Sequence, residues 1–485
     1  MTAIVIAIAP LCYAASYGSY TYDYWGDPVD APQAYLPEKV INGAALGTIA
    51  LKEPMDMTSD SNGNIYIADS GNGRILVLNQ EYRLIKEIRS FKNNGADDTF
   101  VKPQGVFVGE NGHVFVADTE NGRIVELDAA GELVRIIGAP ESELFGENFV
   151  YKPMKLVVDK AGRFHIVAQN MNKGLLELDA DGAFVGFFGA IKVFPNMLEY
   201  MWKMVATEEI KSKMQNFVPT EYNNISIDKD GFLYVTTNKL DADRIRDAVV
   251  SRRTDDSVAV VRKLAPSEDD VLRRHGVYPP VGDVSMQYTG IYGGMSQISD
   301  VTVEDSGIYS LLDLKKGRIF TYDNDGNFMY VFGFIGNSLG NFRNPVALVN
   351  STDGDILVLD SQLNHVTVFK ITEYGTLLKK AVTLHYQGDY TASAEKWEQV
   401  LRFNANNDLA YIGMGKAMLR QDRYREAMDY FRAGNSREYY TRAFKLYRKE
   451  WFEENINYII AGVVVLAVGV WIFGKYRKRR CKKEA

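Results

Sequence analysis

The sequence predicts a mainly β fold, a ring of six radial sheets known as a six-bladed β-propeller, followed by a small helical segment and one membrane-spanning helix. Three observations predict this order. Residues 63–78 form two alternating apolar runs around a glycine-containing turn, and the pattern recurs almost unchanged at residues 112–127. After about Leu377 the apolar residues recur at helical spacing, and a stretch without charge extends over residues 456–474. A repeat of about fifty residues with this strand pattern is typical of propellers or solenoids rather than of a single core.

Length and charge narrow the possible classes of protein. With 485 residues the chain is too long for one ordinary core. Its formal net charge is −7, and the last eleven residues carry seven Lys or Arg and one Glu. That tail contributes +6, so the rest of the chain carries −13, which argues against nucleic acid as a partner. The two cysteines, Cys12 and Cys481, lie in the terminal segments, so the body between them has no disulfide.

The N-terminus has the pattern of an exported protein. An apolar run at residues 3–9 is followed by Ala14-Ala15-Ser16, which predicts a signal peptide over residues 1–15. The alternative is an N-terminus that is disordered or buried in the core. Residues 16–35 form a tyrosine-rich leader, whose rings could stack on a glycan or could lie as a strap on the folded body. The strap is the favoured interpretation, because no polar partners at a defined spacing accompany the rings.

Six copies of the repeat can be followed along residues 36–373, with insertions at residues 190–218, 239–257 and 271–295. The fourth and fifth copies are the least regular. The sixth lacks an outer strand, and residues 39–42 ahead of the first copy can supply it. Such a closure joins the two ends of the ring and removes an open sheet edge. The inner strands are expected to begin near Pro54, Pro103, Pro153, Tyr222, Ile298 and Pro345.

This repeat resembles the NHL-repeat family of six-bladed β-propellers. The motif here is a Pro, a short apolar strand, Asp, then Gly-Asn-Ile-Tyr-Ile-Ala-Asp and Asn-x-Arg-Ile. The first two copies match it closely, whereas the third has Gln169 where Asp69 and Asp118 stand in the others. The Asp and Arg of the motif flank a tight turn. Because the pair repeats in successive copies, we expect it to hold the turn rather than to grip a ligand.

One of the insertions offers a candidate partner surface. The insertion at residues 190–218 has Met and aromatic side chains at helical spacing, which predicts either an adaptable partner surface or a helix packed on the propeller. The insertion at residues 239–257 is rich in charge and is expected to be a solvated excursion. The candidate partner surface consists of Met197, Tyr200, Met201 and Trp202.

Residues 374–450 resemble tetratricopeptide repeats. Tyr424 follows Tyr390 by thirty-four positions, the period of that repeat, and Trp397 and Phe431 each come seven residues after those tyrosines. The resemblance covers one and a half to two repeats. It implies a helical unit that binds peptides or proteins.

The C-terminal residues predict a single-span anchor. Residues 451–474 comprise a short lead-in and an uncharged stretch long enough to cross a bilayer, with Tyr458 and Trp471 near its two ends. The basic residues 475–485 follow at once. The positive-inside rule then predicts a cytoplasmic tail and places everything before the span outside. A buried core helix is the alternative.

Catalytic signals are weak. The five histidines include no pair at ligand spacing, and no Ser-centred elbow, Walker loop or dinucleotide fingerprint occurs. The zinc site of propellers that cleave amidated peptides is not recognisable either. A lactonase resembling gluconolactonase is the best enzyme alternative, because that resemblance implies a metal at the mouth of the central channel. The candidate channel-mouth residues are Asp56, Gln104, Lys155, Asn224 and Asp300.

Within that set, Asp56, Asn224 and Asp300 could together hold calcium or another divalent metal. Lys155 counts against it, because its ammonium would lie in the same ring. The family's ligands are also nearer the position of Gln104 than that of Gly105. The alternative is a channel mouth whose polar residues only contact water.

We therefore expect an exported, membrane-anchored binding or scaffold protein with protein, peptide or glycan partners, no cofactor and no nucleic acid. It would present its propeller and helical repeats outside the membrane, in a transport or secretion assembly. A cysteine-free ectodomain on one basic-tailed anchor resembles surface proteins of Gram-positive bacteria. The competing class is a metal-dependent lactonase or hydrolase.

Overall fold

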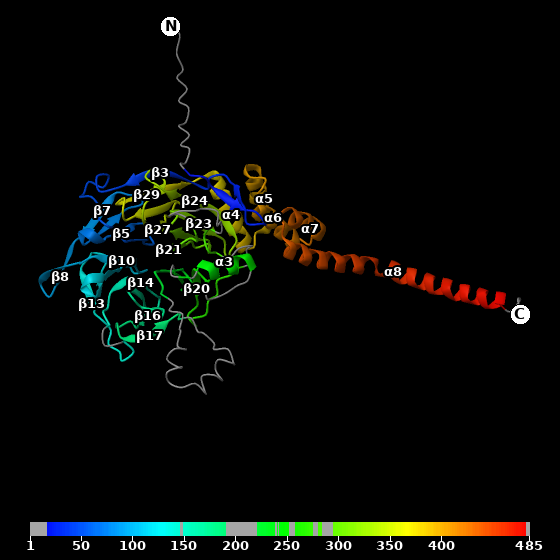
Figure 1. Cartoon of the computed structure of the whole chain (residues 1–485), viewed down its shortest axis with the longest axis horizontal. Helices are drawn as coiled ribbons and strands as arrows, with labels where there is room; N and C mark the ends of the chain where they lie inside the picture. Colours follow the sequence, from blue (N-terminus) through cyan, green and yellow to red (C-terminus); the bar gives the residue numbers. More distant parts are fainter. Residues whose placement is uncertain are drawn as a thin grey trace, which may run out of the picture. The chain divides into compact units, whose positions relative to one another are not determined.

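The computed structural model divides the chain into two compact units, one ending at Lys379 and the other beginning at Lys380 (Figure 1). The expected signal peptide and the candidate partner surface around Trp202 lie outside the residues that the structure describes. The described residues are 17–145, 149–190, 221–237, 240, 242–251, 258–274, 280–283 and 294–481.

The first unit is a six-bladed β-propeller, as the sequence predicts. In blade 1, β4 (Asp56–Ser59), β5 (Ile65–Asp69), β6 (Arg74–Leu78) and β7 (Leu84–Ile88) pair antiparallel in sequence order. The apolar alternation places side chains on both faces of each sheet, where they pack on the neighbouring blades. Gly73 closes the turn between β5 and β6 in the left-handed conformation, at φ 60°, which glycine adopts without steric cost.

Blades 2, 3 and 5 repeat this four-stranded order. The fifth copy, expected to be irregular, is therefore a complete blade. The strands of blade 2 are β10 (Pro103–Val108), β11 (Val114–Asp118), β12 (Arg123–Leu127) and β13 (Leu133–Ile137). Those of blade 3 are β14 (Pro153–Val158), β15 (Phe164–Ala168), β16 (Leu175–Leu178) and β17 (Phe184–Phe188). Those of blade 5 are β21 (Ile298–Val303), β22 (Tyr309–Asp313), β23 (Arg318–Tyr322) and β24 (Phe328–Phe332).

Among the described residues blade 4 has three strands, β18 (Asn224–Ile227), β19 (Leu233–Thr236) and β20 (Val261–Leu264). The chain after β20 covers its outer edge without forming a full strand. The Lys263 N–H donates to Asp270 Oδ1 at 3.1 Å, and the Arg274 guanidinium donates to the Val261 carbonyl at 2.9 Å. In the four-stranded blades an outer strand pairs with the corresponding edge. In blade 4, side chains instead form some of the hydrogen bonds of the edge backbone groups.

The N-terminal strand closes the ring. Strand β3 (Tyr35–Ile41) pairs antiparallel with β29 (His365–Ile371), the third strand of blade 6, and so supplies its outer strand. Blade 6 also contains β27 (Pro345–Asn350) and β28 (Ile356–Asp360). The predicted closure is therefore confirmed, and the closing strand is longer than the four residues expected from sequence.

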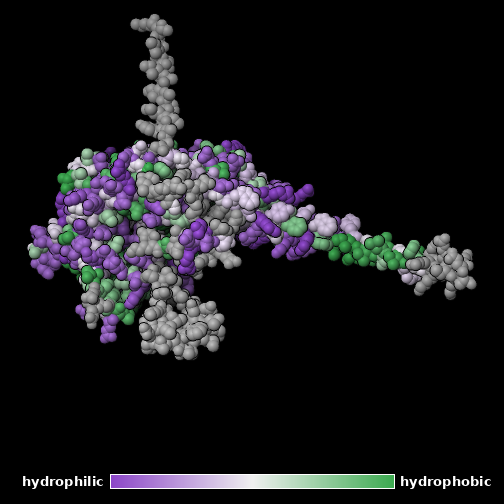
Figure 2. Space-filling model, viewed as in Figure 1, coloured by the Kyte–Doolittle hydropathy of each residue, from purple (hydrophilic) through white to green (hydrophobic). Residues whose placement is uncertain are grey.

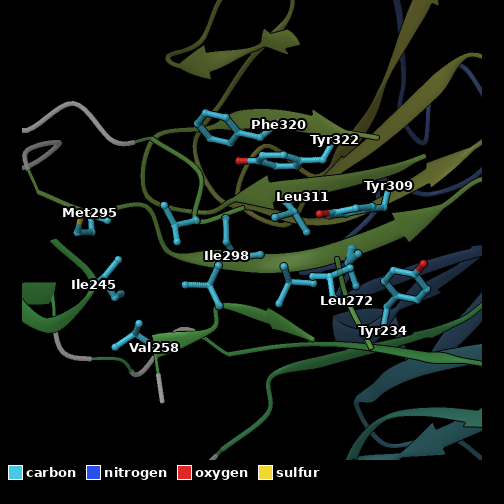
Figure 3. Packing of buried hydrophobic residues seen from close by; sticks show 14 of the residues in the cluster. Tyr234, Ile245, Val258, Leu272, Met295, Ile298, Tyr309, Leu311, Phe320 and Tyr322 are labelled. Atoms are coloured by element: carbon cyan, nitrogen blue, oxygen red, sulfur yellow. The ribbon is translucent and has the colours of Figure 1, made fainter. Parts of the chain in front are cut away.

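Apolar clusters between neighbouring blades form the core. Figure 3 shows the cluster between blades 4 and 5, where the Tyr309 and Tyr322 rings stack with centroids 5.5 Å apart. Helix α3 (Ala242–Ser251), inserted between β19 and β20, contributes Ile245 to this cluster. The charged residues in the described part of that insertion are exposed, as expected, whereas Ile245 and Ala248 pack on the core. Burying a side chain such as that of Ile245 contributes about 1.5–3 kcal/mol to the free energy of unfolding.

The leader forms a strap on blade 5. Its hairpin consists of β1 (Tyr20–Tyr22) and β2 (Pro28–Asp30), and β1 lies against β24. The Ser19 hydroxyl donates to the Val331 carbonyl at 2.8 Å. Two more short pairings lie outside the blades, β8 (Ser90–Asn93) with β9 (Ala96–Thr99), and β25 (Phe334–Ile335) with β26 (Asn341–Phe342).

The boundary between the two units falls within α4 (Glu373–Gln387). The helices that follow are α5 (Tyr390–Phe403), α6 (Asp408–Arg420), α7 (Tyr424–Ala433) and α8 (Arg437–Cys481), and each packs on the next. Asp389 and Asn407 cap the starts of α5 and α6, since their side chains accept from the Ala392 and Ala410 N–H groups.

Two glycines of α6 allow this close helix packing. A Cβ on Gly413 would lie 2.2 Å from Trp397 Nε1, and one on Gly415 would lie 2.5 Å from the Phe431 ring. The two aromatic residues that the sequence places at the repeat spacing therefore lie against glycine in the helix between them. This arrangement agrees with a helical-hairpin repeat.

Helix α8 is long and apolar enough to cross a membrane. Its most apolar eighteen-residue window has a mean hydropathy of 2.4, and none of that window is buried. Figure 2 shows this part of α8 as a continuous green band. The structure therefore does not support the alternative of a buried core helix for this stretch.

Candidate binding site in the central channel

The inner strands of the blades line a polar cavity of about 770 Å³. Asp56, Lys155, Asn224 and Asp300 stand near the start of these strands, in blades 1, 3, 4 and 5, and each lines the cavity. All four are nearly buried, with at most 8% of each residue exposed. From this layer the cavity extends along the inner strands toward the turns that follow them. We call these four residues the inner layer.

Lys155 pairs with Asp56 and so connects two blades that are not neighbours. The Lys155 ammonium donates to the Asp56 carboxylate and, at 2.9 Å, to the Met55 carbonyl. Blade 2 lies between them in sequence order and has Gly105 at this position. A Cβ there would lie 2.4 Å from the Met154 carbonyl oxygen. The missing side chain thus lets blade 3 approach closely and leaves room for Lys155 to reach blade 1.

The two carboxylates of the inner layer also bind backbone groups of the following blade. Asp56 Oδ2 accepts from the Val106 N–H at 2.8 Å, and Asp300 Oδ2 accepts from the Leu348 N–H at 2.6 Å. Asn224 Nδ2 donates to Asp300 Oδ1 at 2.5 Å. The inner layer is therefore a set of links between blades as well as the end of a cavity.

Burial dominates the electrostatics of the inner layer. It raises the pKa of Asp56, although the Lys155 ammonium acts in the opposite direction. Burial also raises the pKa of Asp300 to about 7, with Lys155 lowering it and the Asp56 charge raising it further. Burial thus favours the protonated form of the Asp300 carboxyl.

These residues fit a divalent cation poorly. Calcium takes six to eight oxygen ligands. Here the Asp56 carboxylate already binds Lys155, and Asp300 accepts three N–H donors, from Asn224, Val301 and Leu348. Within the described ranges, no three His, Cys, Asp or Glu side chains are grouped closely enough to hold a metal. Gln104 lies at the bulge between Pro103 and Gly105 and does not line the cavity in the described structure.

The turn pairs of blades 1 and 2 lie away from this cavity. Arg74 Nε donates to Asp69 at 2.6 Å with both side chains fully buried, and Arg123 Nε donates to Asp118 at 2.8 Å. Each Asp also accepts a backbone N–H from the preceding loop; for Asp69 the donor is Lys52, at 2.7 Å. These contacts agree with the structural role expected from the repetition.

One buried charge cluster had no signal in the sequence. In blade 5, Arg318 stands where Arg74 does, yet its guanidinium donates to Asp283 at 2.6 Å and to the Tyr20 hydroxyl at 2.7 Å. Asp283 comes from the third insertion, and it also accepts from Lys316 and Tyr22. The leader, the insertion and blade 5 therefore meet at one carboxylate. A pairing over such sequence distances leaves no local pattern.

Two segments of the chain, residues 51–78 and 100–127, match the NHL repeat. They correspond to blades 1 and 2, the copies with the closest motif. No curated protein matches the chain in sequence.

Among solved structures, a streptogramin B lyase is 11% identical, with a TM-score of 0.41 over 70% of this chain and 100% of that one. A protein of unknown function from Bacteroides thetaiotaomicron is 13% identical, with a TM-score of 0.42 over 66% and 70%. The WD40 β-propeller domain of Doa1 is 10% identical, with a TM-score of 0.39 over 70% and 98%. Likenesses at this level say nothing about a ligand or an activity.

Proposed function

We propose that this chain is a membrane-anchored binding or scaffold protein that presents a propeller and tetratricopeptide-like repeats to protein or glycan partners outside the membrane. The observation that carries this proposal is the apolar window of α8, which has a mean hydropathy of 2.4 and no burial. An exposed helix of that hydropathy needs a lipid or protein environment. Propellers and helical repeats most often serve as interaction surfaces, which is an argument from fold alone.

The proposed topology has the tail in the cytoplasm and both folded units outside. Seven basic residues follow the span, whereas Glu450, Glu453 and Glu454 precede it. The apolar N-terminal run would direct export and be removed at about residue 15. A transport or secretion assembly on the surface of a Gram-positive bacterium is the setting that we propose for it. Met197, Tyr200, Met201 and Trp202, in the insertion at residues 190–218, are proposed to contribute to the partner surface.

Labelling of cysteines from one side of the membrane tests this topology. In intact cells, an impermeant maleimide should label an Asp97→Cys variant, since Asp97 is an exposed residue of the β8–β9 hairpin. Cys481 should react only after permeabilisation. A Cys12→Ser background removes the other native thiol. Labelling of Cys481 before permeabilisation, with Asp97→Cys silent, would reverse the proposed orientation.

The second candidate is a metal-dependent lactonase or hydrolase at the channel. The observation that favours it is that Asp56, Asn224 and Asp300, two carboxylates and one amide, line the same cavity. The Lys155–Asp56 ion pair opposes it. Calcium and zinc titration of the detergent-solubilised full chain separates the two functions. Stoichiometric metal that is lost in an Asp300→Ala variant would favour the hydrolase, and binding unaffected by that change would exclude this site.

A further inference from the structure

Two similarly exposed aromatic groups on α8 lie at different distances from its apolar stretch. Phe444 is 42% exposed, and the adjacent Trp451 and Phe452 are 45% and 47% exposed. Trp451 follows Phe444 by seven residues, about two helical turns, so the two lie on the same side of the helix. Ala443, in contrast, is fully buried on the side that packs within the helical unit.

The geometry of one uninterrupted helix sets the height of these rings. Helix α8 runs without a break from Arg437 to Cys481. At 1.5 Å per residue, Trp451 lies about 7.5 Å and Phe444 about 18 Å before Ile456, where the uncharged stretch begins. The headgroup layer on each side of a bilayer is about 5–8 Å thick. Trp451 and Phe452 therefore fall at its depth, whereas Phe444 lies well above it.

Two glutamates indicate where the hydrocarbon layer begins at the N-terminal end of the apolar stretch. Glu453 and Glu454 directly precede the uncharged stretch, and both are exposed. Carboxylates at these positions stay in the headgroup layer or in water, so the hydrocarbon begins after Glu454. The rings of Trp451 and Phe452 then stand one turn above the hydrocarbon, where amphipathic aromatic side chains are enriched.

We propose that Trp451 and Phe452 bind the headgroup layer of the outer leaflet, so that α8 holds the helical unit at a fixed height above the bilayer. This proposal rests on the proposed membrane anchoring. The partner is the lipid surface, and the two rings that contact it lie before the membrane-spanning stretch. Leu446, Tyr447 and Glu450 of α8 are still partly buried, so the packed part of the helix ends near Glu450, about 9 Å before the apolar stretch. The surfaces of α5, α6 and α7 would then be offered to partners close to the membrane.

Depth-dependent quenching tests the proposal on the full chain. Since Cys12 and Cys481 are the only cysteines, Cys12→Ser and Cys481→Ser give a background for single labels. A fluorophore on Asn455→Cys, in phosphatidylcholine vesicles that contain headgroup nitroxide lipid, should be quenched. Adding Trp451→Ser and Phe452→Ser should reduce this quenching at least twofold, because the helix loses its hold on the interface. Phe444→Ser, the matched control, should leave it unchanged.

A second label separates this proposal from the anchoring that it rests on. Val465→Cys should be quenched by acyl-chain nitroxide lipid, and absence of that quenching would overturn the anchor itself. If Val465→Cys is quenched while the paired change at Trp451 and Phe452 behaves like Phe444→Ser, the headgroup proposal fails and the anchor stands. Disulfide-linked dimers of a Trp451→Cys variant would assign the rings to a second copy of the chain and would also overturn it.

Discussion

The turn pairs of blades 1 and 2 and the inner layer of the channel use the same kinds of side chain in different ways. Asp69 and Arg74 form a pair within one blade, and blade 2 repeats it with Asp118 and Arg123. In the inner layer the residue type changes along the ring, with Asp recurring only in blades 1 and 5, and the bonds of these side chains extend to other blades. Lys155 even reaches past blade 2 to blade 1. The turn pairs thus hold single blades, whereas the side chains of the inner layer link one blade to another.

The largest effect should come from breaking the fully buried turn pair. Arg74→Met leaves Asp69 buried without its partner and should lower the free energy of unfolding by about 3–5 kcal/mol. Arg123→Met is the matched control. Both arginines also pair with a partly exposed carboxylate, Glu87 or Asp98. The Arg123 side chain, however, is 16% exposed and that of Arg74 is fully buried, so water can replace more of the Arg123 contact. Urea denaturation of the solubilised full chain measures both, and equal losses would show that burial does not decide the strength of the pair.

Breaking the link across the ring should cost somewhat less. Lys155→Met leaves the Asp56 carboxylate unpaired beside the cavity, where water can reach it, and should cost about 3 kcal/mol. A double variant with Asp56→Asn should recover part of that loss, because the uncompensated charge is gone. The coupling energy comes from a double-mutant cycle by denaturation. Strictly additive losses would mean that the two residues do not interact in solution.

The raised pKa of the buried Asp300 should make the free energy of unfolding depend on pH. Its pKa is about 7 in the folded chain, against about 3.9 unfolded. Between these values the folded state binds more protons, so stability is highest at low pH and falls as pH rises. The contribution lost between pH 5 and pH 7 is about 2 kcal/mol. The stability of an Asp300→Asn variant should lack this part of the slope, and an unchanged slope would assign it to other groups.

The smallest of these effects should come from filling the gap in the inner layer. Gly105→Ala places a Cβ 2.4 Å from the Met154 carbonyl oxygen, so the two inner strands must separate slightly. We expect a loss of about 1–2 kcal/mol, measured by thermal unfolding. Gly138→Ala is a suitable control, because a Cβ there meets nothing within 4 Å. A loss no larger than the control's would show that blades 2 and 3 tolerate the added volume.

Much of the propeller could be predicted because its signals are local. Alternation, the glycine turn and the motif of blades 1 and 2 all lie within about thirty residues, and the missing outer strand of blade 6 indicated the closure by β3. The irregularity of blade 4 was expected, but the cover on its outer edge was not, since Asp270 and Arg274 act through side chains that carry no strand pattern.

The candidate site was harder to predict than the fold. Sequence alone aligned Asp56, Lys155, Asn224 and Asp300 at the channel, and the structure places all four on the cavity wall. It could not show that Lys155 binds Asp56, because the two are 99 residues apart and the contact depends on the absence of a side chain at Gly105. Gln104, the fifth candidate, lies at a backbone bulge between Pro103 and Gly105 and does not line the cavity in the described structure.

The closing strand has a consequence for the order of events during synthesis. Strand β3 is made among the first residues of the ring, yet its partner β29 follows more than three hundred residues later. At roughly 5–20 residues per second, the two are separated by about 15–60 seconds of translation. Through that interval the incomplete ring has unpaired strand edges. A chain that stalls or is truncated before β29 would therefore be a substrate for chaperones and proteases rather than a smaller working propeller.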